Sequence, residues 1–472
     1  MTNINLVLPE IFISLALMFF LIIGVFKKNS SNLIYNLSIL SLIILLALIV
    51  NLASINETSL FNESYKIDEL STFMKILTIF SGIFVMLTSS KYLKLTKIFK
   101  IEYPVLILCS ILGMMVMISS NDLIVFYMGL ELQSLSLYIL ASFNRDNVLS
   151  SESGVKYFVL SALSSGLLLY GCSLIYGFSG STNFILISDN LNANSYGLTF
   201  GIVFILVGLA FKISAVPFHM WAPDVYQGSP TSVTIFFAIL PKIAALTVFI
   251  RFLYVPFLDL IDQWQMIMVF LSIASMLFGA VAAIGQKNLK RLIAYSSIGH
   301  MGYALIALAS GPEAGGAALL VYMVIYALSQ LGIFGVILSM RRRGGMVEDI
   351  NELSGLSTSM PWLAVCMTAL VFSVAGIPPL GGFFGKLVVF QAGIEAGLWP
   401  IVIIGIIASV ISLGYYLRII MLIWGGEKQP AFQEMSGTVA LTVTTATLLV
   451  FPVFVVFIGW MMALAGGNFT FG

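Results

Sequence analysis

The sequence contains little charge. Of its 472 residues, 9% are Asp, Glu, Lys or Arg, whereas 60% are hydrophobic. A soluble domain carries about 25% charged residues, so this chain has too little polar surface to fold in water. Its net charge of +1 shows no basic or acidic excess, and nucleic acid is therefore not an expected partner. A polytopic protein in a lipid bilayer is expected instead.

Cysteine and histidine are also scarce. The three cysteines, Cys109, Cys172 and Cys366, lie far apart inside apolar runs and form no CxxC pair. Two histidines and three dispersed cysteines do not fit the usual iron–sulfur, haem or zinc sites. We therefore expect no metal site and no bound cofactor in this chain. The glycines before Lys386 do not make a phosphate loop, because their spacing is too short and Leu387 replaces the required Ser or Thr.

Long apolar runs dominate what remains. A helix that crosses a bilayer needs about 20 largely apolar residues, and helices are forced because unpaired backbone groups are too costly in hydrocarbon. By this rule the sequence predicts fourteen spans, at 6–26, 33–53, 70–90, 103–120, 122–143, 153–178, 197–220, 230–255, 264–285, 290–310, 315–340, 361–391, 399–424 and 437–464. The first run is too long for a signal peptide and its positive pair follows it, so an uncleaved span is expected.

The positive charges of the loops predict the orientation. Fourteen Lys and Arg residues fall in alternate loops on one side, and only Lys66 and Arg251 fall in the opposite loops. The richer side is cytoplasmic by the positive-inside rule. Both termini are then expected to be periplasmic in a bacterial inner membrane. The alternative location is a mitochondrial inner membrane.

Prolines interrupt two of the predicted spans. Pro217 lies in the seventh span, and Pro378 and Pro379 lie in the twelfth. Proline removes a helix hydrogen bond and clashes with the preceding turn, so both spans are expected to break at membrane depth. Each break has a lysine beside it, Lys212 or Lys386. The two breaks are an odd number of spans apart, which predicts two units of inverted orientation, a pattern found around transport sites.

Among the ionisable residues inside the spans, five are candidates for function: Glu131, Lys156, Lys212, Lys242 and Lys386. Each costs about 2.5–3.5 kcal/mol at the bilayer centre on the insertion scale, and such residues usually mark an ion or proton path. A buried lysine can release its proton near neutral pH, whereas arginine keeps its proton. Glu131 and Lys156 lie on adjacent antiparallel spans, where opposite charges can pair.

Structural explanations compete with this interpretation. Glu131 and Lys156 can form a static ion pair that locks two helices, although such a pair is often no more stable than apolar packing. A lysine near a helix end can extend its amine to the membrane interface. That explanation is expected for Lys75, whereas Lys212 and Lys242 lie too deep in their spans for it.

The two histidines are candidate relays, because their ordinary pKa is near neutral. His300 has polar neighbours in the stretch YSSIGHMGY, and His219 follows the first break. A lone histidine is more often a structural group with satisfied hydrogen bonds, and this alternative applies most to His219. Asp224 and Glu152 are expected to solvate the ends of loops.

Three stretches resemble the proton-translocating family shared by respiratory complex I and the Mrp-type cation/proton antiporters. They are KISAVPFHMWAPDVYQGSP at 212–230, LKRLIAYSSIGHMGY at 289–303 and GIPPLGGFFGK at 376–386. The resemblance covers nearly the whole chain. The stretch GLELQSLSLYIL around Glu131, and lysine rather than glutamate at position 386, resemble one membrane subunit of complex I more than its sisters.

The resemblance implies an all-α polytopic fold with two inverted five-helix repeats (spans 4–8 and 9–13), each with a broken helix. The implied domains are a three-helix segment at 1–102, the first repeat at 103–255, the second at 262–424, and a C-terminal helix at 425–472. The partners would be other membrane subunits of the complex, namely the antiporter-like subunit M and small subunits such as K and J. NADH, FMN, iron–sulfur clusters and quinone would belong to partner subunits.

The resemblance also assigns a role to each charge in a proton path coupled to quinone reduction elsewhere. Glu131 and Lys156 would form the input pair, Lys212 the switching lysine, Lys242 the central bridge and Lys386 the exit. Two other functions remain open. One is a Na⁺/H⁺ antiporter subunit of the Mrp type, driven by an ion gradient, and the other is an assembly scaffold with vestigial lysines. The neighbouring genes distinguish the redox-driven pump from the antiporter.

Overall fold

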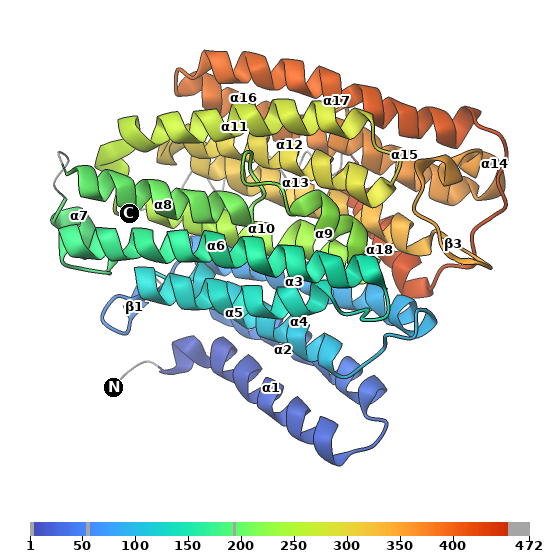
Figure 1. Ribbon diagram of the computed structural model, residues 1–472, viewed down its shortest axis with the longest axis horizontal. Coiled ribbons are helices and arrows are strands. Elements are labelled where there is room, and N and C mark those ends of the chain that lie inside the picture. The colour runs from blue at the N-terminus through green and yellow to red at the C-terminus, as the bar shows by residue number, and fades with distance from the viewer. Residues whose placement is uncertain (1–3, 53–56, 192–194, 452–472) are drawn as a thin grey trace. The chain divides into compact units, whose positions relative to one another are not determined.

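The computed structural model describes residues 4–52, 57–191 and 195–451, and these are mostly helical (Figure 1). The α-helices are α1 (Leu8–Phe26), α2 (Ser31–Leu52), α3 (Glu69–Leu95), α4 (Glu102–Ile118), α5 (Leu123–Ala141), α6 (Val148–Ser179), α7 (Phe184–Asp189), α8 (Tyr196–Lys212), α9 (Ala222–Gly228), α10 (Thr231–Tyr254), α11 (Ile261–Ile284), α12 (Leu289–Ala309), α13 (Pro312–Ser339), α14 (Leu356–Ser359), α15 (Pro361–Ala375), α16 (Gly381–Glu395), α17 (Trp399–Gly425) and α18 (Gly437–Val450). The 3₁₀ helices are η1 (Ile4–Val7), η2 (Leu258–Leu260) and η3 (Ile350–Leu353). Two antiparallel pairs of short strands are β1 (Thr58–Leu60) with β2 (Tyr65–Ile67), and β3 (Arg341–Arg342) with β4 (Gly345–Met346).

The helical membrane fold is confirmed. Within the described part of the chain, ten helices are long and apolar enough to cross a membrane, and four shorter apolar helices are α4, α8, α15 and α18. These fourteen helices coincide with the fourteen predicted spans. The largest differences from the prediction are at the two interruptions: the span at 197–220 stops at Lys212, and the one at 361–391 is divided into α15 and α16. The last predicted span, 437–464, is described only as far as residue 451; its remaining residues lie outside the described part of the chain.

The two interruptions occupy matching places in the order of elements. After α3, the membrane helices run α4, α5, α6, α8 and α10, and then α11, α12, α13, α15 with α16, and α17. The interrupted helix is the fourth of five in both series. The first interruption separates α8 from the short α9, and in the second Gly376 ends α15 with a φ of +86°, a backbone conformation that favours glycine. The predicted domain boundaries stay a prediction.

The chain forms two compact units, each built around one fully buried helix. The first unit contains the residues before Ser214 together with Gly228–Trp264, and the second contains Ser214–Gln227 and the described residues after Trp264. Within the first unit α10 packs against α3, α4, α5 and α8, and within the second α13 packs against α12, α15, α16 and α18. A polar side chain on such a helix must find its partners inside the protein.

Polar residues at the ends of the apolar segments set where the helices begin. The side chains of Asp122, Asn147 and Asn288 accept hydrogen bonds from the first backbone N–H groups of α5, α6 and α12. Asp68 and Ser71 form a reciprocal capping box at the start of α3. These caps supply acceptors for N–H groups that have no partner inside the helix.

Glycines bring α4 and α5 into close contact. A Cβ atom on Gly113 would lie 2.5 Å from the backbone nitrogen of Gln133, and one on Gly129 would lie 2.8 Å from the carbonyl oxygen of Gly113. Both obstructing atoms belong to the backbone, which cannot rotate away. This contact holds the helix that carries Glu131 against its neighbour.

We expect Gly113→Val to lower the free energy of unfolding by about 1–3 kcal/mol, the usual effect of overpacking. The thermal midpoint of the purified protein in detergent measures this. Gly166→Ala on α6 is the matched control, because an added Cβ there meets no atom within 4 Å. Equal midpoints for the two variants would contradict the proposed close contact.

Candidate functional site

Lys212 lies at the end of α8 in a pocket of hydroxyl groups. Its side chain is buried, and its Nζ atom donates hydrogen bonds to Ser134 Oγ and Ser161 Oγ, both at 2.7 Å. The Tyr138 hydroxyl lies 3.5 Å from Nζ and 2.5 Å from Ser161 Oγ. The three groups come from α5 and α6. The amine of Lys212 is therefore surrounded by neutral groups that can both accept and donate hydrogen bonds.

Glu131 belongs to the same surroundings. It lies on α5, three residues before Ser134 and seven before Tyr138, a spacing that places all three on one face of the helix. Its carboxylate accepts a short hydrogen bond from Ser165 of α6 and acts electrostatically on Lys212. One face of α5 thus presents both a negative charge and hydroxyl groups to the buried lysine.

Lys156 has a partner that the sequence analysis did not predict. Its Nζ atom forms an ion pair with Glu152 Oε1 at 2.6 Å, and both side chains are more than a third exposed. Helix α6 begins at Val148, earlier than predicted, so Glu152 lies one helical turn before Lys156 rather than in a loop. The structure therefore gives Lys156 a local partner, Glu152, on its own helix.

Lys242 is the most completely buried of the candidates. It lies in the middle of α10, where every residue is buried, and its own exposed fraction is 1%. The preceding Pro241 has no N–H group, so the helix loses one hydrogen bond at this level. The sequence analysis did not use Pro241, although a proline next to a lysine within an apolar run was the signal that could have predicted this irregularity.

Lys386 is held at the second interruption. Its Nζ atom donates to the carbonyl oxygen of Ala375 and to Ser409 Oγ, both at 2.9 Å, and lies 4.9 Å from the centre of the Tyr303 ring. Ala375 is the last residue of α15, where carbonyl groups lack partners within the helix and the helix dipole is negative. The broken helix thus creates an acceptor for a buried cation.

His300 lies beside Lys386 in a small cavity of the second unit. Tyr322, Tyr326, Ser329 and Ser373 share its lining with both residues. The Nδ1 atom of His300 lies 2.6 Å from the Tyr322 hydroxyl, and Nε2 lies 3.3 Å from Tyr416. His300 is therefore a satisfied histidine that also faces the cavity of a candidate lysine.

His219 has less polar surroundings. It is partly exposed, and its ring lies 4.4 Å, centre to centre, from that of Phe278. Its neighbour Asp224 is not solvated at a loop end as predicted but forms an ion pair with Arg291 at 2.5 Å. The break at Pro217 is thus fastened to α12 of the same unit.

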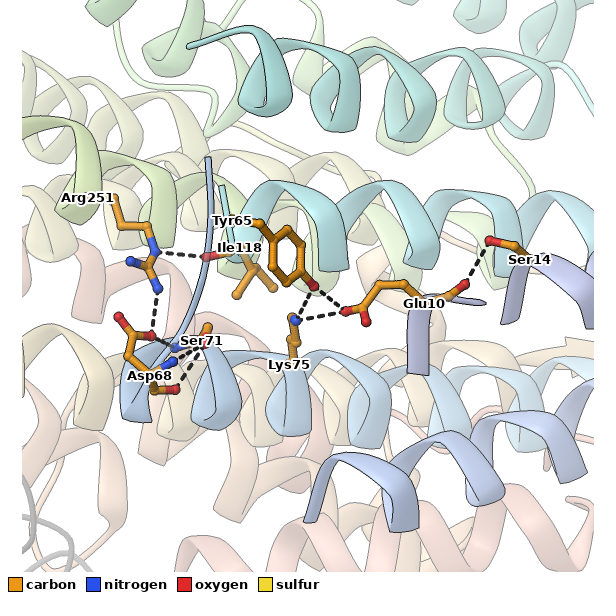
Figure 2. A network of polar contacts seen from close by, with 8 residues as sticks. All are labelled: Glu10, Ser14, Tyr65, Asp68, Ser71, Lys75, Ile118 and Arg251. Carbon is orange, nitrogen blue, oxygen red and sulfur yellow. Dashed lines mark hydrogen bonds and ion pairs between the residues drawn. The ribbon is translucent and has the colours of Figure 1, made fainter. Parts of the chain in front are cut away.

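Two buried charges were missed or misread in the sequence (Figure 2). Lys75 does not extend to the interface, because its Nζ atom lies 2.8 Å from Glu10 Oε1 and both side chains are 7% exposed. Arg251, assigned to a loop, forms a buried ion pair with Asp68 at 2.6 Å. Burial raises the pKa of Asp68, but the Arg251 guanidinium and hydrogen bonds from Ser71 lower it more, leaving it below its usual value. Glu10 could have been recognised in the sequence, because it is an acidic residue within the first apolar run.

Comparison with known proteins identifies the family. Residues 120–412 match the family described as "NADH:quinone oxidoreductase/Mrp antiporter, TM". The chain is 61% identical over 459 residues to NADH-quinone oxidoreductase subunit N of Pelagibacter ubique (strain HTCC1062), covering 96% of this chain and 97% of that relative.

Solved structures agree with this match. A chain of respiratory complex I from Thermus thermophilus with bound aureothin shares the fold with a TM-score of 0.82 and 27% identity, over 97% of both chains. A chain of the Mrp complex from Dietzia sp. DQ12-45-1b has a TM-score of 0.87 at 20% identity, over 98% of this chain and 96% of that one, a similarity that shows the fold alone. The prediction of an antiporter-like membrane fold is confirmed, and the similarity favours complex I over Mrp. The chain belongs to the NADH:quinone oxidoreductase/Mrp antiporter family and, within it, to the group of subunit N of NADH-quinone oxidoreductase.

Proposed function

We propose that this chain carries protons across the membrane through Lys212, Lys242 and Lys386, driven by quinone reduction in other subunits of NADH:quinone oxidoreductase. The observation that carries the proposal is the neutral surroundings of the buried amines. Lys212 donates to hydroxyl groups, and Lys386 donates to a hydroxyl and a carbonyl. An amine without a carboxylate partner can lose its proton without leaving an unpaired charge behind.

The side chains around these amines are suited to passing protons on. Serine and tyrosine hydroxyl groups both donate and accept hydrogen bonds. A hydroxyl beside Lys212 can therefore form a hydrogen bond with the amine whether the amine is protonated or neutral. The cavity of Lys386 and His300 has the same character in the second unit. Lysine serves here where arginine does not, because arginine keeps its proton in proteins.

Coupling requires that a distant event change the free energy of one buried proton. Moving one charge across 100 mV costs about 2.3 kcal/mol. A unit charge on a nearby side chain contributes an energy of this order at an effective dielectric constant of about 20, and less as the distance grows. The Glu131 carboxylate acts on Lys212, so we propose that a change in its protonation or position drives the step. The input group in this mechanism is Glu131, with Lys156 exchanging its partner between Glu152 and Glu131.

The setting of this mechanism is part of the proposal. The chain would act as one subunit of an oxidoreductase that holds NADH, FMN, iron–sulfur clusters and quinone elsewhere. Its membrane neighbours would include subunit M and small subunits such as K and J. We propose a bacterial inner membrane with both termini on the periplasmic side, since the loops rich in Lys and Arg fall on the other side.

Replacing Lys212 by Met tests the proposal. We expect the NADH-driven proton uptake of membrane vesicles to fall by the share that this subunit contributes, because the switching amine is absent. Lys212→Arg should keep a positive charge and the assembled complex but lose the same uptake, because arginine does not release its proton. Proton uptake is followed with a pH-sensitive dye, and assembly with a native gel.

Lys100→Met provides the control, since Lys100 is exposed. Uptake in this variant should equal that of the parent. Normal uptake in the assembled Lys212→Met complex would contradict the proposal and would direct attention to Na⁺-dependent antiport.

Gly376 tests the geometry of the exit lysine. Its φ of +86° disfavours a side chain, and an added Cβ would lie 3.0 Å from Lys386 Cδ and 3.2 Å from Nζ, so the lysine side chain would have to shift. Alanine in the left-handed conformation costs about 1–2 kcal/mol. We expect Gly376→Ala to lower proton uptake per NADH oxidised, because the amine is displaced from its acceptors.

Gly397→Ala separates this effect from backbone strain. Gly397 has a φ of +74°, but no atom lies within 4 Å of an added Cβ. The control should share the strain and keep its proton uptake. An equal loss in both variants would show that displacement of Lys386 is not the cause.

A further inference from the structure

Glu10, Tyr65 and Lys75 form a closed cluster in the first unit, apart from the lysines of the proposed path; we call it the α1–α3 triad (Figure 2). Glu10 comes from α1, Tyr65 from β2 and Lys75 from α3. Glu10 Oε1 accepts from the Tyr65 hydroxyl at 2.6 Å and from Lys75 Nζ at 2.8 Å, and Nζ lies 2.8 Å from the Tyr65 hydroxyl. Each of the three polar groups therefore contacts the other two.

One oxygen atom of the triad has no hydrogen-bond partner among the described residues. Glu10 is 6% exposed, and its second carboxylate oxygen, Oε2, is buried without a hydrogen-bond partner among the described residues. A buried carboxylate oxygen without a hydrogen-bond partner is destabilising. Both oxygens of a purely structural carboxylate would be expected to have partners. The free oxygen is an acceptor at which a proton can be held.

Tyr65 joins the triad to an apolar cluster. Its ring packs with Leu6 and Ile67, and Leu52 and Leu60 lie against this apolar cluster. Burial, and then the Glu10 carboxylate, raise the pKa of Tyr65 well above its usual value, so the hydroxyl stays protonated. The other charged group that acts on Tyr65 is Arg251, which is paired with Asp68.

The triad lies at nearly the same depth as Lys242. Helices α3 and α10 pack against each other, and the Asp68–Arg251 ion pair joins the start of α3 to the end of α10, so the two run antiparallel. Lys75 comes seven residues after Asp68, and Lys242 comes nine residues before Arg251. At 1.5 Å per residue these are about 10 and 14 Å from the ion pair. The depths of the two lysines therefore differ by less than one helical turn.

We propose that the α1–α3 triad is a proton-loading site that exchanges protons, through water, with Lys242 on the neighbouring helix; this rests on the proposed function. In the loading step, Glu10 Oε2 takes a proton from hydronium and releases water, while Lys75 stays an ammonium ion. The triad then changes from neutral to a charge of +1. In the unloading step the same proton returns to water on the way to Lys242, and the carboxylate is restored. Tyr65 keeps its proton throughout and orients Oε1.

The test uses the complete complex in vesicles and the variants Glu10→Gln, Lys75→Met and the double variant. We expect Glu10→Gln to lower the proton uptake per NADH oxidised by the same amount as Lys212→Met. The rate of NADH oxidation in uncoupled vesicles should stay unchanged. The double variant should do no better than Glu10→Gln. The infrared band of a protonated carboxylic acid that appears on reduction should lose the Glu10 contribution.

A structural ion pair predicts the opposite pattern. Removing one partner leaves a buried unpaired charge, whereas removing both relieves it, so recovery of uptake in the double variant would overturn the proposal. Lys66→Met is the matched control, since its ion pair with Glu57 lies on the same hairpin and Glu57 is exposed. Its uptake should equal that of the parent.

Two further outcomes distinguish a failure of the triad proposal from a failure of the proposed function. Normal uptake in assembled Glu10→Gln, together with lost uptake in Lys212→Met, would reject the triad and leave the proposed function intact. Normal uptake in both would reject the proposed function itself. If the Glu10 variants do not assemble, Tyr65→Phe decides, because it removes one oxygen and keeps the ring. Unchanged uptake in that variant would overturn the proposal.

Discussion

The cost of holding charge in a low-dielectric interior is the constraint on which the arrangement of this protein depends. Two solutions appear in the described residues. Lys75 and Arg251 are neutralised by the carboxylates of Glu10 and Asp68. Lys212 donates to neutral oxygen atoms instead. An ion pair favours one fixed charge state, whereas neutral acceptors tolerate the gain and the loss of a proton. The difference in partners therefore separates the lysines of the proposed path, which can lose their proton, from Lys75 and Arg251, which keep theirs.

The helix interruptions supply part of the neutral surroundings. The end of α15 presents the Ala375 carbonyl to Lys386, and Gly376 leaves room for the lysine side chain. Helix α8 likewise ends at Lys212, whose amine reaches hydroxyl groups of α5 and α6. Irregular backbone at membrane depth is tolerated where it is buried in protein. The interruptions thus position the lysines, and the lysines in turn satisfy backbone or hydroxyl groups that would otherwise be buried without partners.

The fold by itself does not specify what drives transport. A chain of an Mrp complex shares the fold at 20% identity, while a subunit N sequence is 61% identical to this chain. One helical scaffold therefore serves members with different partner subunits, and function is argued from particular sites. In this chain the proposed sites are the amines with neutral acceptors and the carboxylate of Glu131 that acts on one of them.

The sequence alone determined the helical membrane class, the approximate positions of the apolar helices in the described part of the chain and the lysines beside the two proline breaks. These follow from local properties, since apolar length and proline chemistry act within one segment. The tertiary structure decided which charges meet. Lys156 pairs with Glu152 because α6 starts at Val148 and so contains both residues, one helical turn apart. Lys75 contacts Glu10, which lies 65 residues away in the sequence, and Tyr65 of the neighbouring hairpin. Such pairings depend on how helices pack and rotate against one another, and no periodicity within a single apolar run records that.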